Sequence, residues 1–204
     1  MSVPREYIGD RILHIGGGTG AALPLYQEAV RADWLEANPV IAESLKFQLE
    51  EVDEAEKHHV HALCAFDRSM DARPFYVGGN LGELGSTLRA TQGLKDAFDA
   101  YGRWSRIMVP TTSINDFLTD FDDTLPDTWV VQAGGAEDLV LLGGHEFIGK
   151  EPLNTVVCTL YHSPLYQGQG HPDNIISMLN EFDFRLVGMY STHTTKRVSA
   201  VFIR

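Results

Sequence analysis

The stretch that decides the fold is RILHIGGGTG, residues 11–20. An apolar run interrupted by His14 predicts a buried strand, and four glycines and a threonine follow it. The next stretch, ALPLYQEAVR at 22–31, predicts a short helix despite Pro24. A strand that enters a glycine turn and then a helix is where α/β proteins bind nucleotides. The turn is not a Walker A loop, because no Gly-Lys-Ser/Thr follows it.

Glu36 adds to this prediction. It lies at the end of the second predicted strand, ADWLEANP at 32–39, and follows Gly16 by 20 residues and Gly20 by 16. An acidic residue about 20 residues after such glycines commonly accepts hydrogen bonds from ribose hydroxyls. The glycine turn and Glu36 together therefore favour a nucleoside ligand. The alternative is that Glu36 only faces solvent beside the turn.

Composition limits the class of protein. A chain of 204 residues predicts a single domain over 1–204, and 44% hydrophobic with 22% charged residues is typical of a globular protein. The net charge of -12 argues against nucleic acid as a partner, because phosphate binding needs a basic surface. The sequence contains neither an apolar run of about 20 residues nor a signal peptide, so we expect no membrane insertion and a cytoplasmic location. Cys64 and Cys158 lie in apolar stretches and are expected to be buried, reduced core residues.

Strand-like and helix-like segments alternate along the chain, which is typical of an α/β sheet with crossover helices. The further expected strands are 58–66, 73–79, 107–112, 128–135, 154–161, 184–191 and 197–204, the last two as a hairpin-like pair. The expected helices are 41–56, one after residue 112 capped near Ser113 or Thr112, 136–148 and 171–184, with a loop over 80–94.

Several stretches, in order, resemble the FkbM family of S-adenosylmethionine-dependent methyltransferases. They are HIGGGTG, WLEANP, CAFDRSMDARPFYV, ELGSTL, VPTTSINDFL, VVQAGGAEDLVLLGG, SPLYQGQ and AVFIR, and they extend from Arg11 to Arg204. The resemblance implies a Rossmann-like class I methyltransferase fold, a seven-stranded, mostly parallel sheet of order 3-2-1-4-5-7-6 with helices on both faces. It also implies S-adenosylmethionine as cofactor and methyl transfer to a hydroxyl of a sugar or small natural product.

The resemblance assigns cofactor-binding residues. Gly16, Gly18 and Gly20 would shape the cofactor loop, Glu36 would bind the ribose, and Asp67 would lie near the adenine. His14 stands where the family carries Asp, so it is the fourth residue of the expected cofactor loop.

Four charged positions of the family motifs are uncharged here: they read His14, Val130, Gln132 and Thr159. Two hypotheses follow. One is an enzyme with a remodelled pocket, and the other is a catalytically degenerate relative that acts as a binding or assembly subunit, alone or as part of a homo- or hetero-oligomer.

Methyl transfer to an alcohol needs alignment and a base for the proton, and a histidine could be that base. His162 follows the strand that carries Thr159, so His162 and Gln132 are the predicted catalytic residues. Ser86, Thr87 and Arg89 in the 80–94 loop could instead bind substrate, or lie in a solvent loop with no ligand role. The histidines of HHVH at 58–61 lack a carboxylate at ligand spacing, so no metal site is predicted.

Overall fold

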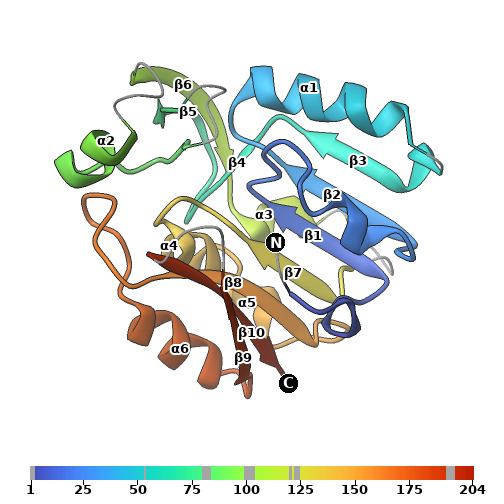
Figure 1. Cartoon of the computed structure of the whole chain (residues 1–204). Helices are drawn as coiled ribbons and strands as arrows, with labels where there is room; N and C mark the ends of the chain where they lie inside the picture. The colour runs from blue at the N-terminus through green and yellow to red at the C-terminus, as the bar shows by residue number, and fades with distance from the viewer. Residues whose placement is uncertain are drawn as a thin grey trace.

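The computed structural model describes residues 3–52, 54–79, 84–98, 104–119, 121, 125–191 and 196–204. Its main sheet has seven strands in the order β3-β2-β1-β7-β8-β10-β9 (Figure 1). These are β1 (Arg11–Ile15), β2 (Arg31–Leu35), β3 (His58–His61), β7 (Thr128–Val131), β8 (Thr155–Tyr161), β9 (Arg185–Ser191) and β10 (Arg197–Ile203). The strands from β3 to β8 pair in parallel, and β10 pairs antiparallel with both β8 and β9. The sheet order implied by the FkbM resemblance is therefore confirmed.

A second, smaller sheet lies beside the carboxyl ends of β1 and β7 (Figure 1). It consists of β4 (Cys64–Ala65), β6 (Ser105–Thr112) and β5 (Met70–Val77), in that order. The predicted strand 58–66 is thus wrong as one element, because the chain leaves the main sheet after His61 and joins the second sheet at Cys64.

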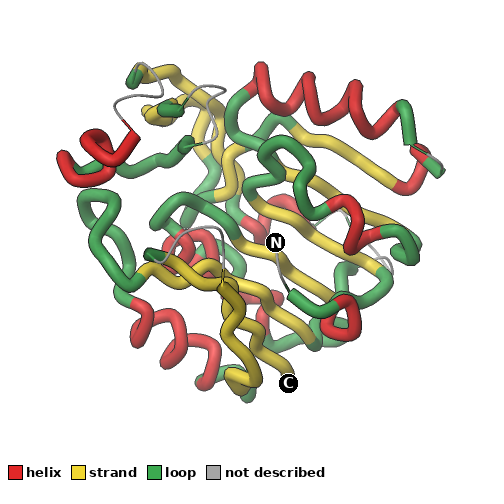
Figure 2. Tube along the Cα trace, in the orientation of Figure 1, coloured by secondary structure: helices red, strands yellow, loops and turns green. Residues whose placement is uncertain are grey.

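Helices cover both faces of the main sheet (Figure 2). On one face, α1 (Pro39–Glu50) packs with the 3-10 turns η1 (Arg5–Tyr7) and η2 (Leu23–Tyr26). The other face carries α3 (Ile114–Leu118), α4 (Glu137–Leu142), α5 (His145–Ile148) and α6 (Pro172–Asn180). Two further elements are α2 (Gln92–Phe98) and the 3-10 turn η3 (Ala55–Lys57). Among the described helices, none has the length and apolar character needed to cross a membrane.

Helix boundaries follow local chemistry. The Asn38 side chain accepts a hydrogen bond from Val40 N at the start of α1, and the Ser113 hydroxyl accepts one from Asp116 N at the start of α3, as the sequence predicts for Ser113. The predicted helix 136–148 is two helices. A methyl group on Gly143 would lie 2.2 Å from the Phe66 carbonyl oxygen, so this close approach to the second sheet needs glycine where the helix breaks.

Other predicted elements also differ from the structure: the predicted helix 41–56 is α1, which ends at Glu50, and the predicted strand 128–135 is β7, which ends at Val131. The helix expected over 22–31 is only η2. Because β2 begins at Arg31, beside the start of the parallel strand β1, the chain has to return along the length of β1 before it reaches Arg31. The predicted 80–94 loop ends in the first turn of α2, and residues 80–83 of it lie outside the described residues.

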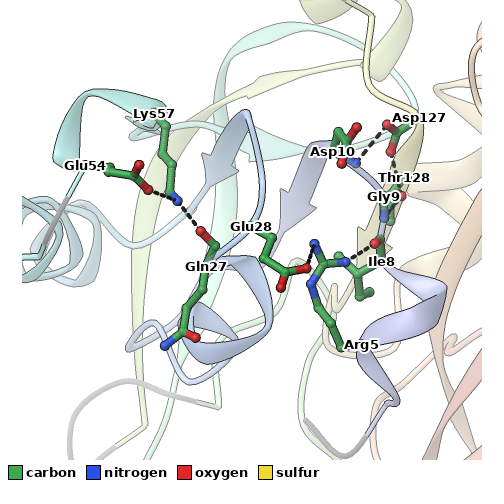
Figure 3. Close-up of polar contacts among 10 residues, drawn as sticks. All are labelled: Arg5, Ile8, Gly9, Asp10, Gln27, Glu28, Glu54, Lys57, Asp127 and Thr128. Carbon is green, nitrogen blue, oxygen red and sulfur yellow. Dashed lines mark hydrogen bonds and ion pairs between the residues drawn. The ribbon is translucent and has the colours of Figure 1, made fainter.

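The amino-terminal segment is hydrogen-bonded to residues at the start of β7 (Figure 3). The Asp127 carboxylate accepts hydrogen bonds from the backbone N–H groups of Asp10, at 3.0 Å, and Arg11, at 3.1 Å. Gly9 N donates to the Thr128 hydroxyl at 3.0 Å, which in turn donates to Asp127. One carboxylate therefore sets where β1 enters the sheet next to β7.

We expect Asp127→Ala to lower the free energy of unfolding by about 2 kcal/mol, because it leaves the two backbone donors without their acceptor. Urea unfolding followed by circular dichroism measures this. Asp10→Ala is the matched control, since it removes the same charge from an exposed neighbour and keeps the backbone N–H; an equal loss in both variants would contradict the assignment.

Candidate nucleoside-binding cleft

Three parallel strands of the main sheet end at one cleft. Gly16 follows β1, Glu36 follows β2 and Gln132 follows β7, and all three line the same space of about 640 Å³, part of which is open to solvent. In open α/β sheets, ligands bind at the carboxyl ends of the strands where the strand order reverses, and β1 and β7 flank that point here. The remaining lining residues are Ile15, Gly18, Thr19, Leu35, Ala37, Ile41, Leu63, Cys64, Ala65, Phe75, Gly85, Thr87, Ala133 and Ala136.

The glycine turn has the backbone freedom that its sequence predicts. Gly16, Gly18 and Gly20 all have positive φ angles, of 78°, 53° and 74°. A methyl group on Gly16 would lie 2.0 Å from the Gln132 carbonyl oxygen, so the ends of β1 and β7 approach each other only because residue 16 has no side chain. Gly16 and Gly18 line the cleft, whereas Gly20 packs toward Leu45 of α1.

Glu36 is bound to this turn rather than free in solvent. It is 7% exposed, and its two carboxylate oxygens accept hydrogen bonds from Gly18 N and Asn38 N, each at 2.8 Å. Burial raises the pKa of Glu36, while the backbone N–H donors act in the opposite direction. Each oxygen keeps a further lone pair, so the carboxylate can still accept hydrogen bonds from a ligand in the cleft.

His14 faces the core behind the cleft and does not line it. Its ring is stacked on Trp34, with centroids 4.9 Å apart, and its two nitrogens lie 2.9 Å from the Tyr26 hydroxyl and 3.3 Å from Gln132 Oε1. Burial lowers the pKa of His14 to about 4, against a smaller raising effect of the Gln132 hydrogen bond. The side chain is therefore a neutral imidazole near pH 7.

Some of the other predicted residues line the cleft and some do not. Gln132 lines it, and Thr87 from the predicted substrate loop lines it as well. Asp67 and His162 are not lining residues: the Asp67 carboxylate pairs with Arg68 at 2.8 Å, and His162 is exposed just beyond the end of β8.

The part of the 80–94 loop that carries Ser86 contacts the turn after β7. The Ser86 hydroxyl donates to the Gly134 carbonyl oxygen at 2.7 Å and accepts from Leu88 N at 2.9 Å. This places Thr87 over the cleft. The residue is 9% exposed, and its hydroxyl oxygen is buried and has no hydrogen-bond partner in the part of the chain that the structure describes. A buried, unsatisfied hydroxyl in a cleft is the group that a ligand would be expected to satisfy.

Two supporting residues were not predicted from the sequence. Tyr26 meets His14 only through the course of the chain after the glycine turn, and no local pattern marks it. Glu137 is fully buried at the start of α4, where its carboxyl oxygen accepts from Ala133 N at 2.8 Å and so holds the turn that lines the cleft. Burial raises the pKa of Glu137 to about 8. The Gly-Ala-Glu of the sequence motif is the signal that could have identified it.

Comparison with known proteins gives the fold of this chain. No protein-family model matches the sequence, and no curated protein matches it. Among solved structures, a methyltransferase FkbM from Methylobacillus flagellatus KT matches with a TM-score of 0.61 and 14% identity, over 95% of this chain and 43% of that one. This chain thus spans less than half the length of that protein.

Two further structures match over larger shares of their own chains. Magnesium protoporphyrin IX methyltransferase from Synechocystis PCC 6803, with bound SAM, has a TM-score of 0.54 at 11% identity, over 97% of this chain and 71% of that one. Aeropyrum pernix fibrillarin, in complex with S-adenosyl-L-methionine, also has a TM-score of 0.54, at 9% identity, over 100% of this chain and 70% of that one. The chain therefore has the Rossmann-like methyltransferase fold, and the FkbM resemblance is confirmed at the level of the fold.

The buried imidazole gives stability a defined pH dependence. The pKa of His14 is lower in the folded protein than in the unfolded chain, so the unfolded chain binds more protons below pH 6.5. We expect a contribution to stability that is complete above pH 6.5 and decreases by about 3 kcal/mol as the pH falls to 4. Urea unfolding of wild type and His14→Gln at several pH values measures it.

The variant should lack this part of the pH dependence, because an amide does not titrate. His162→Gln, which changes an exposed histidine, should keep the wild-type slope. Equal slopes in wild type and His14→Gln would contradict a neutral, buried His14.

Proposed function

We propose that the cleft binds S-adenosylmethionine and that residues 1–204 act as one methyltransferase domain. The observation that carries this proposal is the contact between Glu36 and Gly18, which fixes an acidic group beside a glycine turn at the carboxyl end of β2. Such a group accepts hydrogen bonds from ribose hydroxyls. The bound SAM or S-adenosyl-L-methionine recorded for two structures of the same fold supports the choice of nucleoside.

The lining of the cleft is consistent with this ligand. Leu63, Cys64, Ala65 and Phe75 form an apolar part that suits a purine ring, next to Glu36, which suits the ribose. Gly16 and Gly18 allow the ligand to come close to the backbone between Glu36 and Gln132.

When bound, S-adenosylmethionine supplies an activated methyl group that an acceptor oxygen can take while the methyl–sulfur bond breaks. The protein's part is to align the acceptor and to leave a path for its proton. Gln132, a predicted catalytic residue, lines the cleft, and we expect its amide to form hydrogen bonds with a ligand there. The proposed acceptor is a hydroxyl of a sugar or another small molecule, as in the FkbM resemblance.

One observation favours a second candidate, a binding or assembly subunit without catalysis. Among the described residues that line the cleft, the titratable side chains are Glu36 and Cys64. Glu36 is engaged by the backbone, and burial raises the pKa of Cys64 to about 12. His162 could act as base only if an acceptor extends beyond the cleft to reach it.

Calorimetric titration with S-adenosylhomocysteine tests the nucleoside site. We expect binding with a micromolar dissociation constant, about -8 kcal/mol, and a loss of at least about 10-fold in affinity for Glu36→Gln and Glu36→Ala. Glu43→Ala, an exposed glutamate on α1, is the control with the same change in charge. If wild type shows no binding, the methyltransferase proposal fails; binding without methylation of any hydroxyl acceptor in a screen supports the second candidate.

Substitution of Thr87 separates an effect on ligand affinity from an effect on stability. Thr87→Val keeps the shape and removes a hydroxyl that has no partner in the described structure, so stability should be unchanged or slightly higher. Affinity for S-adenosylhomocysteine should fall about 5-fold. Thr111→Val is the matched control, because the Thr111 hydroxyl donates to Arg68 O at 2.8 Å and does not line the cleft: this variant should lose stability and keep its affinity. The reverse pattern would exclude Thr87 from the binding site.

A further inference from the structure

A buried chain of hydrogen bonds ends at the cleft. It runs from Tyr26, which is 0% exposed, through His14, which is 1% exposed, to Gln132, which lines the cleft. Trp34 stacks on the His14 ring with an angle of 24° between the ring planes, so the imidazole is held in one orientation. Each of these side chains comes from a different element, η2, β1, β2 and the turn after β7.

The donor and acceptor atoms fix the direction of these hydrogen bonds. Gln132 Oε1 can only accept a hydrogen bond, so the neutral imidazole carries its proton on Nε2 and donates it to this oxygen. His14 Nδ1 is then unprotonated and accepts a hydrogen bond from the Tyr26 hydroxyl. With the amide oxygen occupied, both N–H bonds of the Gln132 amide remain for the cleft.

The position of Gln132 in the cleft determines which part of a ligand it meets. The apolar residues around Cys64 and Phe75 lie on the side of the second sheet, and Glu36 lies between them and the glycine turn. A nucleoside with its base on the apolar side and its ribose at Glu36 would extend its 5′ substituent past Gly16, and the Gln132 backbone lies directly against Gly16.

We infer that Gln132 is a specificity residue that binds a carboxylate on the 5′ substituent of the nucleoside, and that Tyr26 and His14 are positioning residues that hold its amide in the donor orientation. The inference rests on the proposed function, because it concerns the same ligand. An ammonium group at this place finds no matching charge among the described lining residues: Glu36, the one carboxylate there, lies on the far side of the glycine turn. The cleft should therefore recognise the carboxylate end of the ligand and be nearly indifferent to its ammonium group.

Four adenosine thioethers test this by calorimetry. They are S-adenosylhomocysteine, its analogue without the amino group, its analogue without the carboxylate, and 5′-methylthioadenosine, which lacks both. We expect loss of the carboxylate to weaken binding at least about 10-fold and loss of the amino group to weaken it less than about 3-fold. Equal losses, or a larger loss on removing the amino group, would overturn the inference.

Variants then assign the effect to the hydrogen-bond chain. Gln132→Leu should abolish the preference for the carboxylate, so it should weaken binding of S-adenosylhomocysteine more than binding of 5′-methylthioadenosine, and Gln132→Glu should reverse the preference. Tyr26→Phe keeps the packing against Trp34 but releases the His14 tautomer, so it should reduce the preference without abolishing it. A full preference in Tyr26→Phe would overturn the positioning role of Tyr26.

Gln27→Leu is the matched control. Gln27 is an exposed glutamine next to Tyr26, and its described contact is through the backbone oxygen, which accepts from Lys57 Nζ at 2.5 Å (Figure 3). The Gln27→Leu variant should keep the wild-type preference for the carboxylate. Binding of 5′-methylthioadenosine with no carboxylate preference overturns this inference alone, whereas no binding of any thioether overturns the proposed function with it.

Discussion

The contact between the ends of β1 and β7 is the constraint on which the cleft depends. Gly16 and the Gln132 carbonyl approach so closely that a side chain on residue 16 would separate the two strands. Because β1 and β7 flank the reversal of strand order, their close approach sets the floor of the cleft. The turns that follow them then stay within reach of one ligand, and Glu36 fastens the glycine turn from the β2 side.

The region behind the cleft is polar but carries little charge. His14 is neutral because burial disfavours its charged form, and burial makes Glu137 a weak acid for the same reason. Both side chains keep hydrogen-bond partners, so their desolvation is offset without a buried ion pair. This network therefore sets donor and acceptor positions behind the cleft without adding net charge there.

The second sheet explains why this cleft has a closed apolar side. It brings Cys64, Ala65 and Phe75 next to the carboxyl end of β2, and the loop that carries Ser86 and Thr87 bridges from this sheet to the turn after β7. After β1 the chain forms only the short 3-10 turn η2. The second sheet and the loop with Ser86 and Thr87 therefore enclose the cleft from the side opposite to this turn.

The sequence by itself determined the alternation of strands and helices, the glycine turn and the acidic residue 20 positions beyond it, because these depend on hydrophobic pattern and local backbone conformation. The order of the strands in the main sheet followed only from the FkbM resemblance. It could not determine which face of the sheet His14 occupies, since strand alternation needs a known register and a known partner on each side. It also placed residues 58–66 in one strand, because a strand that changes sheets has the same apolar pattern as one that does not. Only the tertiary structure decided that Tyr26 and Gln132 meet at His14 and that His162 lies outside the cleft. Contacts between residues more than 100 positions apart, such as His14 and Gln132, arise from the packing of the whole sheet and leave no local signal.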